Sequence, residues 1–152
     1  MSDSRPETYE HITQVRMALK KAVINLLNRA DQHDQTKLVS PQVEYFDKFA
    51  GTLKNIEFGS PEHEKTVQQL APALEDHWAK ERHHPQHYLN GIQDMSLLDL
   101  LEMICDWMAS TKRMRNGNIR KSIEFNQERF HFSDELKGIF NNTIDELFGD
   151  EV

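Results

Sequence analysis

The chain of 152 residues has little of several features that would indicate particular classes of protein. Its single cysteine, Cys105, excludes an intrachain disulfide, a thiolate zinc knuckle and a CxxC redox pair. No stretch approaches the roughly 18 apolar residues of a membrane helix, and residues 1–10 lack the apolar core of a signal peptide. We therefore expect a cytoplasmic protein that has no membrane partner and carries Cys105 as a plain buried thiol.

Basic residues are also scarce. Eighteen Lys and Arg stand against 25 Asp and Glu, which gives a formal net charge of −7 with neutral histidines. Such a balance argues against a protein that coats nucleic-acid phosphates or an anionic membrane, so we expect no nucleic-acid partner. It leaves room for a local basic site that binds one small anion, and a homo-oligomer is possible.

The apolar residues recur at helical steps of three and four, and no strict alternation typical of strands occurs. We predict an all-α fold, a compact single-domain bundle of about six or seven helices over residues 1–152, with residues 1–7 as a loose tail. The expected helices cover residues 8–30, 41–51, 61–70, 72–84, 96–114, 118–130 and 134–148. Pro72 should start a new helix or kink an existing one.

Capping residues mark the starts of several of these helices. Ser40-Pro41 and Ser60-Pro61 each place a hydroxyl before a proline at the first helical position. The spacing from Ser96 to Asp99 predicts a capping box, and Ser133 should open the last helix in a similar way.

An adjacent His33-Asp34 pair follows the first long helix. An imidazole nitrogen beside a carboxylate oxygen suits a borderline or hard divalent metal ion, and Lys37 could balance charge or hold a phosphate. The alternative interpretation is an ordinary polar helix end.

Four of the eight histidines fall within eleven residues, His77, His83, His84 and His87. Pro85 disfavours helix at His84, so the later histidines should form a loop beside the helix face that carries His77. A tract so rich in histidine is typical of metal or anion binding. The alternative is a loop in which the histidines cap helix ends.

Residues 97–108 are apolar nearly all the way round, which indicates a core helix. The capping box explains Asp99, whereas Asp106 lies mid-helix, where burying a lone carboxylate is costly unless it meets a cation. That cation is either Arg113, in a salt bridge, or a metal. His33, Asp34, His77 and Asp106 together form a nitrogen and oxygen ligand set that suits one or two ions of Mn²⁺, Fe²⁺, Co²⁺, Ni²⁺ or Zn²⁺ better than Ca²⁺.

This order of residues resembles the HD superfamily of metal-dependent phosphohydrolases, an all-α family with the order His … His-Asp … Asp. In that resemblance His33-Asp34 matches the central His-Asp motif of the family, and Asp106 matches its closing aspartate. The histidines from His77 onward correspond to the intermediate ligands of the family. More narrowly, the chain looks like a small uncharacterised family of HD-like bacterial and phage proteins, a likeness that extends from His11 to Phe130.

The first histidine of the family would be His11. A continuous helix would separate it from His33 by roughly 33 Å at about 1.5 Å per residue, so we do not expect His11 to share their metal.

The resemblance implies an enzyme that hydrolyses a phosphate ester, with a nucleotide or similar small metabolite as substrate. The metal would activate a water, and three side chains would neutralise the phosphate, namely Lys37, Arg82 and one of His83, His84 or His87. Glu81 or Asp76 could orient a metal-bound histidine. Two alternatives stay open: an HD-type di-iron oxygenase, and a non-catalytic interaction protein, possibly encoded by a phage, with a structural or vestigial metal site.

The segment 122–130 has two interpretations. Glu124, Asn126 and Arg129 could line a substrate pocket, because the likeness extends over them. We favour the simpler interpretation, a solvated helix face whose Ile123, Phe125 and Phe130 pack inward. Trp78, Trp107 and Tyr88 are expected in the core or a pocket wall.

Overall fold

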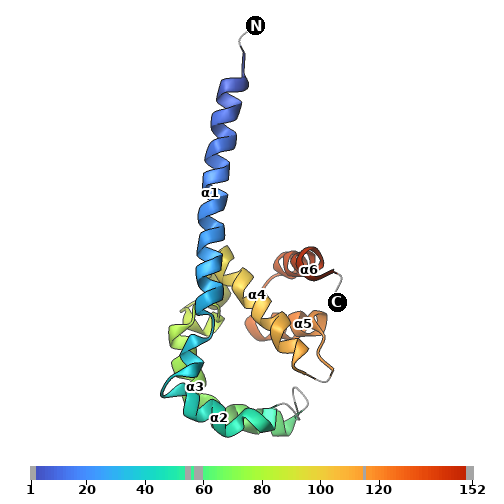
Figure 1. The fold of residues 1–152 in the computed structure, drawn as a ribbon. Coiled ribbons are helices and arrows are strands. Elements are labelled where there is room, and N and C mark those ends of the chain that lie inside the picture. The colour runs from blue at the N-terminus through green and yellow to red at the C-terminus, as the bar shows by residue number, and fades with distance from the viewer. Residues whose placement is uncertain (1–2, 54–55, 57–59, 115, 150–152) are drawn as a thin grey trace. The chain divides into compact units, whose positions relative to one another are not determined.

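Helices make up the regular structure of the part of the chain that our computed structural model describes, residues 3–53, 56, 60–114 and 116–149. No β-strand occurs in these ranges, which confirms the all-α prediction. The elements are α1 (Arg5–Gln32), η1 (Gln35–Leu38), α2 (Gln42–Leu53), α3 (Pro61–Lys80), η2 (Pro85–His87), η3 (Gly91–Asp94), α4 (Leu97–Lys112), α5 (Ile119–Phe130) and α6 (Asp134–Phe148), where η is a 3₁₀ helix (Figure 1). Among the described helices, none has both the length and the apolar composition needed to cross a membrane.

The chain divides into two compact units, residues 1–33 and residues 34–152, and each is described by itself. The prediction of a single domain over the whole chain stays a prediction. The first unit consists of one long helix, α1. It begins at Arg5, three residues before the expected start, so the expected loose tail over 1–7 is wrong for residues 5–7. Pro6 lies in the first turn, where no intrahelical partner for its backbone nitrogen is needed.

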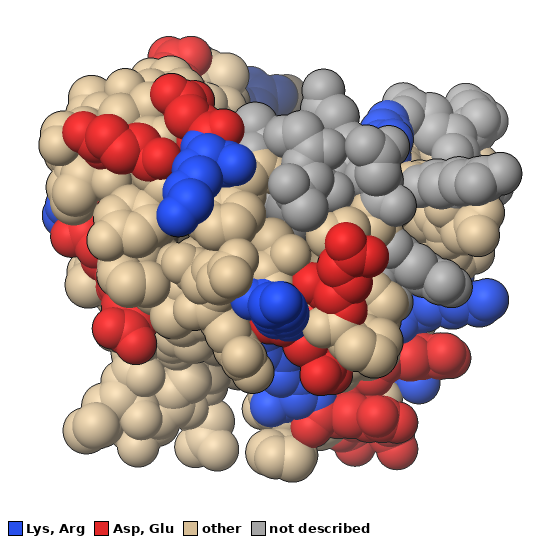
Figure 2. Space-filling model, turned by 90° about the horizontal axis from the view of Figure 1, so that it is seen from below, with Lys and Arg blue, Asp and Glu red and all other residues tan. Residues whose placement is uncertain are grey.

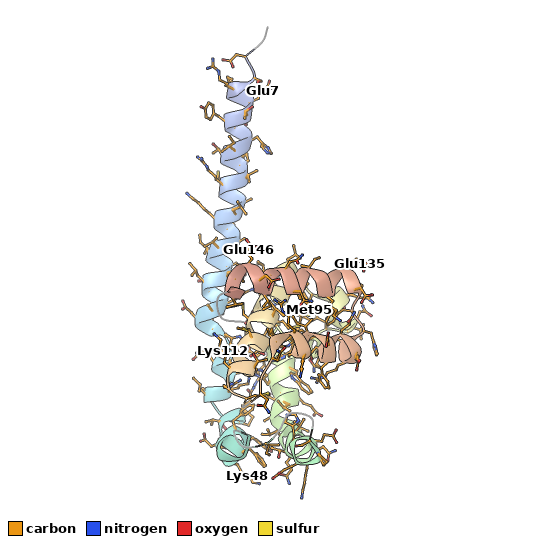
Figure 3. All side chains as sticks on the ribbon, turned by 90° about the vertical axis from the view of Figure 1, so that its right-hand side faces the viewer. Glu7, Lys48, Met95, Lys112, Glu135 and Glu146 are labelled. Atoms are coloured by element: carbon orange, nitrogen blue, oxygen red, sulfur yellow. The ribbon has the colours of Figure 1, made fainter. Side chains whose placement is uncertain are left out.

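The core of the second unit lies between α4, α5 and α6. Its buried side chains are Met103, Ile104 and Met108 from α4, Ile119 and Ile123 from α5, Phe132, and Phe140 and Ile144 from α6. Trp107 stacks on Phe130 at 6.4 Å between ring centroids and meets Phe140 edge-on at 6.0 Å. Figure 3 shows side chains filling the space beneath α6, which runs between Glu135 and Glu146. Cys105 is only half-buried, and this burial raises the pKa of its thiol.

The helices α2 and α3 pack against each other, and η1 contacts both. Contrary to expectation, α3 passes through Pro72 without a break and ends at Lys80 rather than at residue 84. The proline is tolerated because both it and Gln68, whose carbonyl loses its partner, are solvent-exposed. The helix ends early because Glu81 and His84 are extended, and His84 precedes Pro85 as expected for a residue before proline.

Three of the four predicted helix starts are confirmed. Ser60, Ser96 and Ser133 are N-caps whose side chains accept backbone hydrogen bonds, and Ser96 forms the complete capping box with Asp99. The start at Ser40-Pro41 is wrong, because α2 begins at Gln42. The backbone amide groups of Gln42 and Val43 both donate to the carbonyl of Val39, so the chain turns before the helix begins.

Candidate metal centre

Four side chains of the second unit bring potential metal ligands together. Asp34, His77, His83 and His84 each offer one nitrogen or oxygen atom, and these atoms all lie within 4.8 Å of one another. The Nε2 atom of His77 lies 2.9 Å from His84 Nε2 and 3.2 Å from Asp34 Oδ1. His77 and His83 are each 1% exposed, so the centre is screened from bulk water on their side.

A hydrogen-bond chain orients His77. The hydroxyl of Thr36 in η1 donates to Glu81 Oε1 at 2.7 Å and lies 3.2 Å from His77 Nδ1. Since the hydroxyl proton is given to Glu81, the Thr36 oxygen accepts from a protonated His77 Nδ1, and we assign that tautomer from this network. The lone pair of His77 Nε2 then faces a carboxylate oxygen and a second imidazole nitrogen. Three electron-rich atoms in this arrangement fit a cation held between them.

Asp34 and His83 are held in a comparable way. Asp34 takes the left-handed backbone conformation, φ 58°, that ends the turn before η1, a conformation that aspartate tolerates better than most residues. Lys37 Nζ donates to Asp34 Oδ2 at 2.6 Å, which leaves Oδ1 toward the imidazoles. His83 has Nε2 at 3.6 Å from Asp34 Oδ1 and Nδ1 at 3.2 Å from Glu102 Oε1. A carboxylate behind a ligating histidine is the usual arrangement at metal centres.

His84 is suited to act as a neutral donor. Burial, together with the neighbouring imidazoles of His83 and His77, lowers the pKa of His84 to about 3, although Asp106 opposes the shift. The ring is therefore unprotonated near neutral pH, and an unprotonated imidazole is the form that binds a metal ion.

Asp106 approaches the same centre from α4. One of its carboxylate oxygens lies within 4.8 Å of a carboxylate oxygen of Asp34. Its neighbour Asp99 has another task, because it closes the capping box and pairs with Arg82 at 3.2 Å. Asp99 and Asp106, two of the three acids of this apolar helix, therefore have different neighbours.

The predicted site residues divide into three groups. Asp34 and His77, predicted as ligands, lie together with His83 and His84, which were predicted to contact phosphate, and the predicted ligand Asp106 lies within 4.8 Å of Asp34. Lys37 contacts Asp34, in keeping with its predicted charge-balancing role.

Away from the cluster, Arg82 is bound to Asp99, and His87 has Nδ1 at 3.0 Å from the carbonyl of Trp78. Asp76 accepts hydrogen bonds from Gln42 and Lys80 instead of a cluster histidine. His33 is the C-cap of α1 and ends the first unit.

Sequence reasoning missed two contributors, Thr36 and Glu102. Thr36 lies in the segment with His33-Asp34 and Lys37, and its hydroxyl was available to orient an imidazole. Glu102, with 13% of its side chain exposed, is a second acid within an apolar helix, the same signal that singled out Asp106. Glu81, considered from the sequence for orienting a ligand, does so through Thr36.

A cavity of about 1090 Å³ lies beside the centre and shares His84 and Asp106 with it. Trp78 and Trp107 are in its wall, as expected for pocket residues, and α5 supplies much of the opposite lining. Outside it, acidic and basic side chains are interspersed over the face shown in Figure 2.

Residues 1–146 match the family of unknown function DUF5662, so the chain belongs to this family. No curated protein and no solved structure matches the chain.

Proposed function

We propose that the protein is a metal-dependent phosphohydrolase that acts on a nucleotide or a similar small phosphate ester. The observation that supports this proposal is the convergence of four donors, Asp34, His77, His83 and His84, within 4.8 Å of one another. Three imidazoles and a carboxylate suit Zn²⁺, Mn²⁺, Fe²⁺, Co²⁺ or Ni²⁺. The order of these residues along the chain also resembles that of the HD superfamily.

The residues around the centre have distinct tasks in this proposal. A bound divalent ion would polarise a phosphoryl oxygen and lower the pKa of its water. Thr36 and Glu81 hold the His77 ring in position, and Glu102 does the same for His83. Lys37 is occupied by Asp34 and offsets the charge of the ligand set, so we assign it no direct bond to phosphate.

An HD-type di-iron oxygenase is the second candidate. Asp106 lies within 4.8 Å of Asp34, which extends the donor set toward the size that two ions require. Oxygen consumption by the iron-loaded protein, with no phosphate release from any ester, would favour the oxygenase. Phosphate release without oxygen consumption would favour the hydrolase.

The first experiment is elemental analysis of the purified protein and of two variants. His77→Gln removes a buried donor at the middle of the cluster, and we expect it to lose most of the bound metal. His63→Gln is the matched control, because His63 lies in the first turn of the same helix, about 21 Å along its axis at 1.5 Å per residue. The control should keep the metal content of the native chain.

Circular dichroism on both variants separates loss of the site from loss of the fold. A folded His77→Gln protein that keeps its metal, or a native chain that takes up none of these ions, would contradict the proposal. The histidines would then be structural, and the non-catalytic interaction protein would become the better hypothesis. A metal-loaded native chain would next be screened against nucleotides and sugar phosphates for release of inorganic phosphate.

A further inference from the structure

The cavity beside the metal centre has a wall of aromatic side chains. Trp78 of α3, Trp107 of α4 and Phe125 of α5 all line it. Trp78 and Trp107 are the only tryptophans of the chain. Phe125 is 44% exposed, so part of its ring surface is accessible at the cavity wall. Flat apolar surfaces of this kind are where an aromatic ligand stacks.

The helix α5 presents two rows of side chains to the cavity. Lys121, Phe125 and Arg129 are spaced four residues apart, as are Ser122, Asn126 and Phe130, and all six line the cavity. A spacing of four keeps each row on one side of a helix. Of the residues that the sequence analysis assigned to a solvated face, Glu124 and Arg129 are exposed as expected and Asn126 is buried, and both Asn126 and Arg129 line the cavity.

Two of these residues are cations. Among the described residues, neither Lys121 nor Arg129 has an acidic side chain in ion-pair distance, and the guanidinium of Arg129 lies 4.7 Å from the ring centroid of Phe130. Partial burial lowers the pKa of Arg129, although its guanidinium stays charged at neutral pH. Asp106 is the one acid among the described lining residues, and it faces Asp34. The cavity wall of this acidic protein is therefore locally positive.

Asn126 adds a buried hydrogen-bonding group. It is 8% exposed, and its Nδ2 donates to the backbone carbonyl of Ser122 at 2.9 Å. Among the described residues, its Oδ1 accepts no hydrogen bond. An amide oxygen at a cavity wall is placed to accept a hydrogen bond from a ligand.

We propose that this cavity binds an aromatic phosphate monoester, of the nucleoside monophosphate class, with its ring against Trp107 and Phe125 and its phosphate paired with Lys121 and Arg129. Cleavage of the bound ester rests on the proposed function, since it needs the metal centre. The cavity meets that centre at two shared residues, His84 and Asp106. Binding does not rest on the proposed function, since no metal ligand supplies the ring or cation contacts. Asn126 then favours a base that carries an amino group over a plain aryl ring.

Binding is measured on metal-free protein, prepared with a chelator, by tryptophan fluorescence and by calorimetry. The probes are adenosine monophosphate, ribose 5-phosphate, which lacks the ring, and adenosine, which lacks the phosphate. We expect ribose 5-phosphate to bind about tenfold or more weakly than adenosine monophosphate, because base stacking on aromatic side chains contributes at least this much. Both tryptophans line the cavity, so fluorescence should change when adenosine monophosphate binds.

Charge variants test the phosphate contacts. Lys121→Gln and Arg129→Gln should each weaken binding of adenosine monophosphate about tenfold, as for loss of a charge-assisted contact, and leave adenosine unaffected. Lys65→Gln on α3 removes an exposed cation that does not line the cavity, and it should bind like the native protein.

Three outcomes would overturn the inference: equal binding of ribose 5-phosphate, equal effects of Lys65→Gln and the two cavity variants, or no fluorescence change at saturation. The result also separates the two proposals. Ring- and cation-dependent binding by a chain that takes up no metal would support the cavity and contradict the hydrolase. Metal-dependent hydrolysis that shows no preference for aromatic esters would overturn the cavity inference and leave the hydrolase standing.

Discussion

Neighbouring groups differ between two carboxylates of α4, the buried Asp99 and the half-buried Asp106. Asp99, with 0% of its surface exposed, accepts hydrogen bonds from the Ser96 backbone and hydroxyl at 2.8 and 2.7 Å and pairs with Arg82. Burial by itself would raise the pKa of Asp99, but the hydrogen bonds from Ser96 and Arg82 outweigh it and hold the pKa well below its usual range. Asp106 lies within 4.8 Å of Asp34. One acid therefore stabilises the helix start, and the other lies beside the candidate metal centre.

Replacing Asp99 by Asn should lower the free energy of unfolding by about 1–2 kcal/mol near neutral pH, since a cap and a charged hydrogen-bond partner are lost. A depressed native pKa gives stability that is present above the pKa of an unfolded aspartate, about 3.9, and is lost as the pH falls below it. The difference between the native chain and Asp99→Asn should therefore shrink between about pH 5 and pH 2.5. Urea unfolding of both proteins at several pH values measures this difference, and a pH-independent gap would contradict the assignment.

At the scale of elements, α3 takes part both in the packing against α2 and in the candidate metal centre of the second unit. It packs against α2 and contributes the buried residues Leu70 and Ala73, and its last turn contributes His77 to the candidate metal centre. The helix must continue past Pro72 to place His77 there, and it does so despite the missing backbone hydrogen bond. Immediately afterwards, a turn over Arg82 and His83 returns His83 and His84 to the same point.

Because Pro72 is exposed and interrupts no side-chain packing, Pro72→Ala should stabilise the protein. The gain from a restored helical hydrogen bond and a better helix former is about 3 kcal/mol, and the greater freedom of the unfolded chain reduces it to about 2 kcal/mol. Urea unfolding with a linear extrapolation measures the change. Ala79→Gly, at an exposed position late in α3, should lower the free energy of unfolding by about 1 kcal/mol. A destabilised Pro72→Ala protein would show that the proline ring itself is needed.

At the scale of the whole molecule, the candidate metal centre joins segments that are far apart in sequence. Asp34 precedes η1, His77 belongs to α3, His83 and His84 come from the loop after it, and Asp106 comes from α4. A ligand that binds only when these segments are assembled must stabilise the assembled state, because the unfolded chain does not hold the donors together.

Adding Zn²⁺ or Mn²⁺ to chelator-treated protein should therefore raise the midpoint of thermal unfolding. At a free concentration one hundred times the dissociation constant, the stabilisation is about 2.7 kcal/mol, which corresponds to several degrees for a unit of this size. Differential scanning calorimetry of the native chain and of His83→Gln, with and without metal, measures the shift. The variant should lose most of it, and an equal shift in both proteins would mean that the ion binds elsewhere.

Local sequence patterns predicted the helices more accurately than they predicted which residues form the candidate site. The range of α6 and the capping box at Ser96 were predicted correctly, because both depend on neighbours within one helical turn. Residues 72–84 were predicted as a separate helix, because the solvent exposure that makes Pro72 tolerable cannot be read from a propensity. On α5, Glu124 and Arg129 are exposed as predicted, but Asn126 is buried at the cavity wall, because polar residues at helical spacing look the same whether they line a cavity or meet bulk water.

The sequence by itself determined that the protein is helical, where most helices begin, and which segments carry histidine and aspartate side chains of the types that can bind a metal ion, since these properties follow from periodicity, capping and side-chain chemistry over short distances. Only the tertiary structure decided which of those side chains meet. It grouped His83 and His84 with Asp34 and His77, paired Arg82 with Asp99, and placed Thr36 and Glu102 behind the imidazoles. Contacts between residues dozens of positions apart depend on how helices pack, and packing is a property of the whole fold.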